Sequence, residues 1–319
     1  MKKVLVILGP TATGKTDLAL NLAKQINGEL ISCDSRQVYI GLDIGTGKLP
    51  GDEVEVIKGD GFWEMDGTKV WMTDVADAKT QFTVKDYVDQ AKIVVDDIIK
   101  RDKTPIIVGG TGLYLKALLE GLPNLAIPVE KKLRGELESL SVKQLQTKLQ
   151  TLSPIRWKML NESDKQNPRR LLRSIELIFM YPYINTNNNE KGIISKYNTL
   201  KIGLTASRDF LKKRIFSRLS SRLDQGLIEE AVGLHRRGLS FPRMKELGLE
   251  YGILADLLQR KIDKGQFVPI LGTKIYQYAK RQMTWFKKEK DVIWFDITDK
   301  QTPAKVEKRF ATWYYSTYD

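Results

Sequence analysis

The chain has 319 residues, of which 42% are hydrophobic and 29% charged, and its formal net charge is +13. This length allows a sizeable core and two domains, and no apolar run approaches the length of a membrane span. A single cysteine, Cys33, excludes an internal disulfide framework, and a single histidine, His235, excludes a histidine-rich metal site.

The same features predict a cytoplasmic protein. The apolar part of the N-terminal MKKVLVIL stops after five residues at Gly9-Pro10, which is too short for the hydrophobic region of a signal peptide. One cysteine in a chain of this size is typical of a reducing compartment. With histidine almost absent, carboxylates, lysines and hydroxyls remain for proton transfer.

The positive charge is unevenly distributed. Residues 1–121 carry 15 Lys and Arg against 18 Asp and Glu, a net charge of −3, whereas residues 122–319 carry 37 against 21, a net charge of +16. Such a surplus suits a polyanion such as RNA or DNA better than a small phosphorylated metabolite. A basic surface that serves only solubility is the alternative, and charge alone does not decide between the two.

The first motif is LGPTATGKTD, residues 8–17, which has the G-x-x-x-x-G-K-T spacing of a phosphate-binding loop. Residues 4–8 form an apolar stretch of the length of a buried parallel strand. Behind the loop, apolar residues recur at helical spacing until Gly28, where we expect the helix to end. Backbone N–H groups and a helix N-terminus would then face the phosphates. The expected phosphate ligands are Gly9, Pro10, Thr11, Ala12, Thr13, Gly14, Lys15 and Thr16, with the Thr16 hydroxyl holding Mg²⁺.

Further strands and helices alternate up to residue 121. Residues 29–33 predict a second strand that closes on Asp34-Ser35-Arg36-Gln37, and residues 70–72 a possible third. Thr83 and Asp86 form a capping box that opens a helix. Residues 105–108 predict another buried strand, followed by GGTGLY and a helix over 115–119. This alternation is typical of a parallel sheet with helices on both faces.

The pattern breaks at residues 121–128, GLPNLAIP. From there to about residue 195 the chain is predicted to be helical and basic, ending in the Asn-rich INTNNNEKG. Residues 201–204 and 292–295 read as returning strands. We therefore expect an α/β protein: a P-loop NTPase-like parallel sheet with helices on both faces, formed by 1–121 and 196–319, plus a mainly helical insertion domain at 122–195.

Ligands bind an open parallel sheet beyond the carboxyl ends of its strands. The segments GPTATGKT, CDSRQVY and GGTGLY fall there and bring Lys15, Asp34 and Thr111 to one crevice. Asp34 is a candidate general base, although it can also cap the next turn. Thr111 can bind a phosphate oxygen or merely cap the following helix, and the residues alone do not separate these roles.

One expected feature of energy-coupling NTPases is missing. Such proteins have an apolar strand ending in an acid that helps to hold Mg²⁺, whereas the strand before GGTGLY ends in glycines and the candidate Asp296 lies near the far end of the chain. A phosphate loop without a hydrolysis apparatus can bind a diphosphate simply as a leaving group.

Three basic segments lie in the second half of the chain. Arg214, Arg218 and Arg222 recur every four residues and form one stripe of a predicted helix. Residues 167–173, NPRRLLR, begin another helix with three arginines in its first turns, where cations oppose the helix dipole and phosphate contacts would explain them. Residues 278–288 mix bases with aromatic side chains, which suits unpaired RNA, although Trp285 and Phe286 are equally suited to a core.

These segments together resemble the tRNA dimethylallyltransferase (IPP transferase) family. The resemblance rests on GPTATGKTDLAL, ISCDSRQVYIGLDIGTGK, GGTGLYLKALLEG and AKRQMTWF followed by WFD, and it is dense over residues 4–121. It implies transfer of a dimethylallyl group from dimethylallyl diphosphate to N6 of the adenosine 3′-adjacent to the anticodon of tRNA. The phosphate loop would then hold pyrophosphate and not ATP.

The resemblance also implies roles for individual residues. Asp34 would be the general base, and Thr111 and Arg214 would act at the diphosphate. The residues implied to bind tRNA are Asp34, Ser35, Arg36, Gln37, Arg134, Arg169, Arg170, Lys280 and Arg281. Residues 244–252, MKELGLEYG, match the family's glycine-tyrosine segment only loosely. We expect Mg²⁺ as cofactor, tRNA and the allyl diphosphate as partners, and a monomer.

Two other classes of function remain open from the sequence. A small-molecule or nucleoside kinase would use ATP in the phosphate loop and Asp34 as its base, which the charge of +16 in the second half disfavours. A nucleic-acid-binding module would bind RNA tightly without forming a covalent product, and Asp34→Asn would then have no effect.

Overall fold

The computed structural model describes residues 1–50, 54–180 and 192–316. It divides into two compact units, residues 1–120 with 191–319, and residues 121–190. The expected insertion, 122–195, overlaps the second unit, but Ile193–Ser195 (η1) belongs to the first. Most of the Asn-rich segment lies outside the described residues. Within the described chain, no helix is long and apolar enough to span a membrane.

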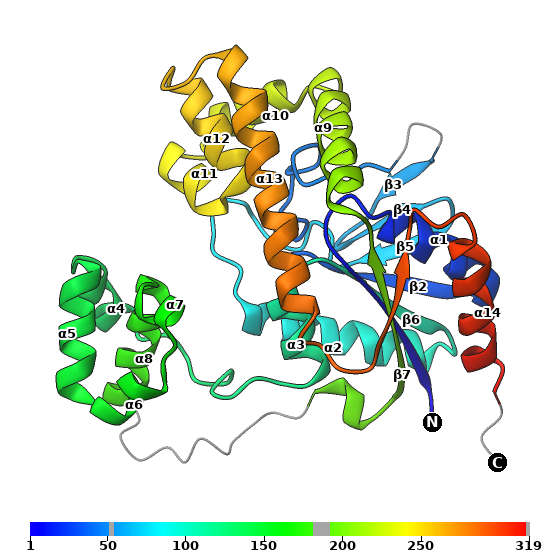
Figure 1. Cartoon of the computed structure of the whole chain (residues 1–319), viewed down its shortest axis with the longest axis horizontal. Coiled ribbons are helices and arrows are strands. Elements are labelled where there is room, and N and C mark those ends of the chain that lie inside the picture. The colour runs from blue at the N-terminus through cyan, green and yellow to red at the C-terminus, as the bar shows by residue number, and fades with distance from the viewer. Residues whose placement is uncertain (51–53, 181–191, 317–319) are drawn as a thin grey trace. The chain divides into compact units, whose positions relative to one another are not determined.

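The first unit is built on an eight-stranded sheet with the order β3-β4-β5-β2-β6-β1-β7-β8 (Figure 1). The strands β5 (Thr68–Trp71), β2 (Gly28–Cys33), β6 (Thr104–Gly109), β1 (Lys3–Leu8), β7 (Asn198–Thr205) and β8 (Val292–Asp296) run parallel. The strands β3 (Val56–Lys58) and β4 (Phe62–Met65) add an antiparallel edge. The predicted fold class, a parallel-dominated α/β sheet with helices, is confirmed.

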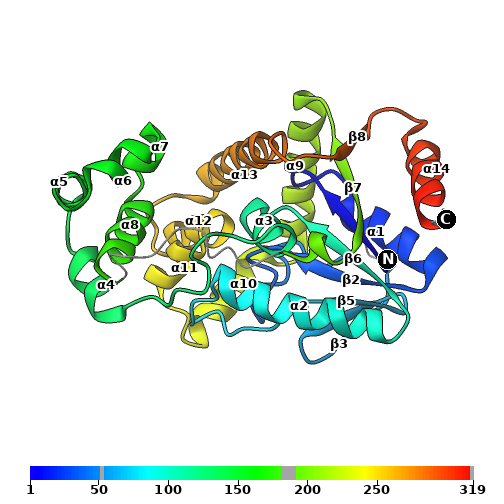
Figure 2. The same cartoon turned by 90° about the horizontal axis from the view of Figure 1, so that it is seen from below.

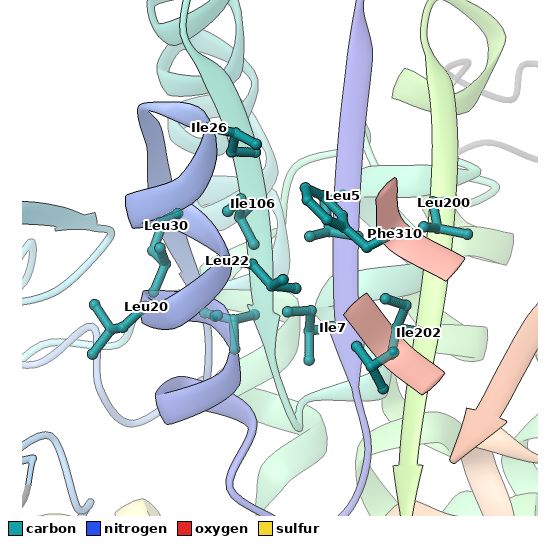
Figure 3. Close-up of a cluster of buried hydrophobic side chains, with 14 of the residues drawn as sticks. Leu5, Ile7, Leu20, Leu22, Ile26, Leu30, Ile106, Leu200, Ile202 and Phe310 are labelled. Carbon is teal, nitrogen blue, oxygen red and sulfur yellow. The ribbon is translucent and has the colours of Figure 1, made fainter. Parts of the chain in front are cut away.

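Helices cover both faces of this sheet. On one face, α1 (Lys15–Ile26) and α14 (Thr302–Tyr314) pack on Leu5, Ile7 and Ile202 (Figure 3). The other face carries α2 (Val84–Lys100) and α3 (Gly112–Leu119), and Figure 2 shows α2 on the side of the sheet opposite α14. Because helices cover both faces of the sheet, the central strands are mostly apolar, and all their residues except Lys3 and Gly109 are buried.

A group of helices follows β7 and completes the first unit. They are α9 (Arg208–Asp224), α10 (Leu227–Arg236), α11 (Phe241–Leu247), α12 (Leu249–Leu258) and α13 (Lys264–Phe286). The long α13 runs from this group to the sheet, where Phe286 is fully buried and so serves the core (Figure 1). Its position brings the last quarter of the chain to the carboxyl ends of the central strands.

The second unit is helical, as predicted. It contains α4 (Lys131–Glu138), α5 (Val142–Leu152), α6 (Pro154–Met159), α7 (Glu162–Lys165) and α8 (Pro168–Met180). A small core of leucines and isoleucines joins α4, α5 and α8, including Leu149, Leu171 and Ile175. This unit carries 11 Lys and Arg against 7 Asp and Glu. The larger part of the charge surplus of residues 122–319 therefore lies in residues 191–319 of the first unit.

Local predictions were mostly confirmed, with two corrections. The Thr83–Asp86 capping box opens α2 as expected. However, α1 ends at Ile26 and is capped by Asn27 in the left-handed region, while Gly28 begins β2. The hairpin β3–β4 was not predicted, because its strands are only three and four residues long and alternate too briefly to give a periodic signal.

Candidate functional site

The phosphate-binding loop has the expected geometry between β1 and α1. Gly9 has a φ of 146°, and a Cβ there would meet the Leu204 carbonyl oxygen at 2.4 Å, so only glycine fits. Gly14 is left-handed and caps α1 without a side chain, which leaves the first N–H groups of the helix available to a ligand. The Lys15 ammonium donates to the Pro10 carbonyl oxygen at 2.8 Å.

This loop forms one wall of a cavity of about 340 Å³ in the first unit. The other walls come from the segment after β2, from residues 44–50, from the β4–β5 hairpin and from α9 and α13. Several of its walls are thus segments that the sequence predicted to meet at the carboxyl ends of the strands.

Cations dominate the cavity next to α1. Lys15, Arg214 and Arg218 line it, and none of the three has an ion-pair partner within the described parts of the chain. Burial, with a further contribution from Arg218, lowers the pKa of Lys15 to about 8, while Asp34 acts in the opposite direction. Burial beside Arg222 likewise lowers the pKa of Arg218. Such uncompensated cations are stabilised by a multivalent anion.

Asp34, which directly follows β2, lines the same cavity as these cations. Its Oδ1 accepts the backbone N–H of Arg36 at 2.9 Å and that of Gln37 at 3.4 Å, so the capping role is real. Its Oδ2 makes no hydrogen bond with any residue that the structure describes. One carboxylate oxygen therefore orients the side chain, and the other is available to a substrate.

Thr111 and Ser35 are not among the described residues that line the cavity. Thr111 precedes α3, yet its side chain caps no helical N–H group, so the capping alternative is wrong. Its Oγ1 accepts the backbone N–H of Ser35 at 3.0 Å. Thr111 thus supports the turn that carries Asp34, and it is not one of the described residues that line the cavity.

Arg36 and Gln37 are held by neighbouring segments. The Arg36 guanidinium pairs with Glu250 at 3.2 Å and lies 4.8 Å from the ring centroid of Tyr278. The Gln37 Oε1 accepts from the Ser32 hydroxyl at 2.7 Å. Arg36, which was expected to contact tRNA, lines the cavity, and its side chain, 13% exposed, links the turn to α12.

The wall formed by residues 41–48, GLDIGTGK, is anchored by a carboxylate. Glu230 on α10 accepts the backbone N–H groups of Asp43, Ile44 and Gly45 at 2.9, 2.7 and 3.0 Å. The Tyr251 hydroxyl donates to the same carboxylate at 2.6 Å. Three backbone donors and a phenol fix one conformation of this wall.

A second anchor comes from α9. Arg222 donates to the Gly45 carbonyl oxygen at 3.1 Å and pairs with Glu250 at 3.5 Å. Arg222 therefore differs from Arg214 and Arg218, although all three belong to the same predicted stripe. Only the latter two are free for an anion.

Gln282 on α13 joins two of the motifs. Its Oε1 accepts the Thr11 N–H at 2.9 Å and its Nε2 donates to the Gly110 carbonyl oxygen at 2.8 Å. The side chain is buried. The phosphate loop is therefore tied to GGTGLY through a residue that is 271 positions away from Thr11.

The remaining predicted tRNA contacts fall into two groups. Lys280 and Arg281 on α13, and Arg169 and Arg170 on α8, are exposed, and Arg170 also pairs with Asp164. Arg134 instead forms a bidentate pair with Glu176, with distances of 2.6 and 2.8 Å, and Glu176 is almost fully buried. Arg134 is thus engaged within the second unit.

Sequence reasoning missed Glu230, Glu250, Tyr251 and Gln282. Each acts on partners far along the chain, so no local periodicity marks it. A signal existed only for Gln282, which lies within KRQMTWF, and for Glu250 and Tyr251, which lie in the loosely matching MKELGLEYG. Gln282, Glu250 and Tyr251 are all buried, and they hold the segments that form the cavity wall.

Comparison with known proteins identifies the family. A family model described as IPP transferase matches residues 37–289. The tRNA dimethylallyltransferase 1 of Hahella chejuensis is 38% identical over 284 residues, which cover 89% of this chain and 87% of that protein.

Solved structures agree. The full-length tRNA isopentenylpyrophosphate transferase from Bacillus halodurans has a TM-score of 0.69 at 32% identity, over 98% of this chain and 97% of that one. A eukaryotic dimethylallyltransferase, solved acting on tRNA, has a TM-score of 0.78 at 25% identity, over 98% of this chain and 78% of that one. This chain belongs to the IPP transferase family.

Proposed function

We propose that this protein transfers a dimethylallyl group from dimethylallyl diphosphate to N6 of the adenosine 3′-adjacent to the anticodon of tRNA, with release of pyrophosphate. Relatives named tRNA dimethylallyltransferase and a related enzyme solved acting on tRNA support the reaction class. The observation that carries the proposal is one cavity with the unpaired cations Lys15, Arg214 and Arg218 on one wall and the Asp34 carboxylate on another.

The cationic wall suits a diphosphate that leaves without hydrolysis. The N–H groups at the start of α1 and the side chains of Lys15, Arg214 and Arg218 would bind the phosphate oxygens. Negative charge grows on the diphosphate as its bond to carbon breaks. Fixed cations in a partly buried site stabilise that charge without reorganisation, which is the largest contribution expected here.

Asp34 supplies the proton acceptor. The adenosine N6 forms a bond to C1 of the allyl group, the C1–O bond breaks, and pyrophosphate leaves with its electron pair. The exocyclic amine is a weak nucleophile, so removal of its proton by the Asp34 Oδ2 assists the attack. The hydrogen bonds of Oδ1 to Arg36 and Gln37 hold the carboxylate in the orientation this requires.

Thr16 is the residue proposed to hold Mg²⁺. Its side chain lines the cavity beside Lys15, and among the described residues no cluster of three His, Cys, Asp or Glu side chains could hold a metal ion. A single hydroxyl fits an ion that keeps most of its water and binds phosphate oxygens. When bound, Mg²⁺ would neutralise part of the charge on the diphosphate.

The tRNA side of the proposal relies on exposed cations in both units. Lys280 and Arg281 on α13, and Arg169 and Arg170 on α8, are exposed and suit contacts to the phosphate backbone. The adenosine must leave its stack to reach the cavity, and this costs least in an unpaired loop. The protein is proposed to act as a monomer in the cytoplasm.

Mass spectrometry of nucleosides tests this function. Unmodified tRNA is incubated with protein, Mg²⁺ and dimethylallyl diphosphate, and in a parallel reaction with ATP and candidate small acceptors. We expect a prenyl increment on one adenosine only in the first reaction, and its loss in Arg218→Gln. Phosphorylation of a small acceptor without any prenylated adenosine would replace the transferase by a kinase.

A further inference from the structure

We infer that Gln282 is a positioning residue for the donor diphosphate, which it serves by fixing the phosphate-binding loop, although it contacts no phosphate itself. The inference deepens the proposed function and rests on it. Gln282 lies within KRQMTWF, between the exposed Arg281 and the core residue Phe286.

Gln282 is the hydrogen-bond partner of one N–H group of the phosphate-binding loop, and both residues line the cavity. A phosphate-binding loop works by aiming successive N–H groups into one concavity. The Thr11 N–H is directed instead to the Gln282 Oε1 at 2.9 Å, and this bond fixes the direction of the peptide at the second loop residue after Gly9. The amide is buried, so water does not replace it.

The other end of the same amide is fixed by GGTGLY. The Gln282 Nε2 donates to the Gly110 carbonyl oxygen at 2.8 Å. A Cβ at Gly110 would lie 2.2 Å from that nitrogen, and a Cβ at Gly112 would lie 2.2 Å from the Trp285 ring. Helix α13 therefore packs so closely against the loop that a side chain at either glycine would displace Gln282 or Trp285. The Gln282 amide is held at both ends and cannot rotate away.

The consequence is specific to the diphosphate. Loss of the amide leaves the Thr11 N–H without a partner, and the loop then loses its fixed orientation toward the α1 N-terminus. Contacts of tRNA to exposed side chains such as Lys280 and Arg281 do not depend on this bond. Gln282 should therefore affect the affinity for pyrophosphate and for the donor, but not that for tRNA.

The test uses Gln282→Met, which keeps the volume and removes both hydrogen bonds. Pyrophosphate affinity is measured by calorimetry and tRNA affinity by filter binding, on the full chain with Mg²⁺. We expect pyrophosphate binding to weaken about tenfold or more, with tRNA affinity unchanged. Gln277→Met, at an exposed position of the same helix, should change neither.

Gly110→Ala serves as a second variant, because its added methyl group displaces the Gln282 amide. If both variants act through the same bond, the double variant should be no weaker than the single ones. Equal loss of pyrophosphate and tRNA binding with a lowered melting temperature would overturn the inference and leave Gln282 as a merely structural residue.

Lys15→Ala separates failure of the inference from failure of the proposed function. If Lys15→Ala loses pyrophosphate binding and Gln282→Met keeps it, the positioning role is wrong and the diphosphate site stands. If neither variant changes pyrophosphate binding, the diphosphate is not bound in this loop, and both proposals fail together.

Discussion

Lys15 shows how a single charged residue that serves ligand binding can lower the stability of the folded chain. Its ammonium is partly buried near Arg218 and has no ion-pair partner within the described residues, and its pKa is lowered to about 8. A lysine whose pKa is lower in the folded than in the unfolded chain destabilises the fold while it is charged. The ligand-free protein therefore carries this cost at neutral pH.

We predict that Lys15→Met raises the free energy of unfolding at pH 7, without diphosphate, by about 1–2 kcal/mol. Below pH 8 the folded lysine is charged, so the gain is complete. It shrinks as pH rises from 8 toward the unfolded value of 10.5, and only above that value is the wild-type residue neutral in both states. Urea titrations at several pH values measure this. Lys100→Met, at an exposed site, is the control, and a destabilised Lys15→Met would contradict the account.

Glu29, near the start of β2, has the opposite effect on stability from Lys15, because its charged form stabilises the folded chain. Its carboxylate is buried, which alone would raise its pKa, but hydrogen bonds from Arg101, Lys103 and Trp71 lower the pKa to about 2. A carboxylate with a depressed pKa contributes stability above its unfolded value, about 4.5, and loses it as pH falls toward 2.

We predict that Glu29→Gln lowers the free energy of unfolding at pH 7 by about 2–3 kcal/mol. The variant should also lose less stability than the wild type between pH 4.5 and 2.5, because it has no carboxylate to protonate. Thermal melts across this range measure both effects, and Glu55→Gln, at an exposed site, should change neither. Parallel acid curves for wild type and Glu29→Gln would refute the role of Glu29.

At the scale of elements, the cavity depends on how α10 holds the wall of residues 41–48. Glu230 accepts three backbone N–H groups of this wall and the Tyr251 hydroxyl. We predict that Glu230→Gln, which removes the charge but keeps the shape, speeds amide exchange at residues 43–45 by about tenfold. Hydrogen exchange measures this, with the exposed neighbour Glu229→Gln as control. Unchanged protection in Glu230→Gln would mean that other contacts hold the wall.

The elements also show what a sequence can reveal. The phosphate loop, the Asp34 turn and GGTGLY follow strands of strong apolar pattern, so both their existence and their common edge could be predicted. Gln282 and Glu230 act through hydrogen bonds to residues far along the chain, and such bonds leave no pattern in composition or periodicity. The hairpin β3–β4 was missed for a different reason, since its strands are too short to show a period.

The role of Arg134 is decided by its contacts in the folded chain and not by its place in the sequence. It was expected to touch tRNA, yet it pairs with the buried Glu176, which also receives Arg173. The family resemblance thus singled out Arg134, but only the packing of α4 on α8 shows that it is paired with Glu176.

At the scale of the whole molecule, exposed and engaged arginines should separate in their effects on tRNA. We predict that Arg281→Ala and Arg169→Ala each weaken tRNA binding and reduce the slope of log affinity against log salt by about 1. Arg134→Ala should instead destabilise the second unit, since it leaves a buried carboxylate short of its partner. Filter binding over a salt series, with thermal melts, distinguishes the two; an unchanged slope in Arg281→Ala and Arg169→Ala would reject the contacts.

The central claim is that one cavity combines a cationic diphosphate site with Asp34 as proton acceptor. The most direct test is single-turnover prenyl transfer by wild type and Asp34→Asn, at saturating tRNA and dimethylallyl diphosphate. Asparagine can keep the Oδ1 bonds to Arg36 and Gln37 and loses only the base. We predict a rate at least 10²-fold lower with both substrates still bound. A rate within a few fold of wild type would show that another group takes the proton and that Asp34 only caps its turn.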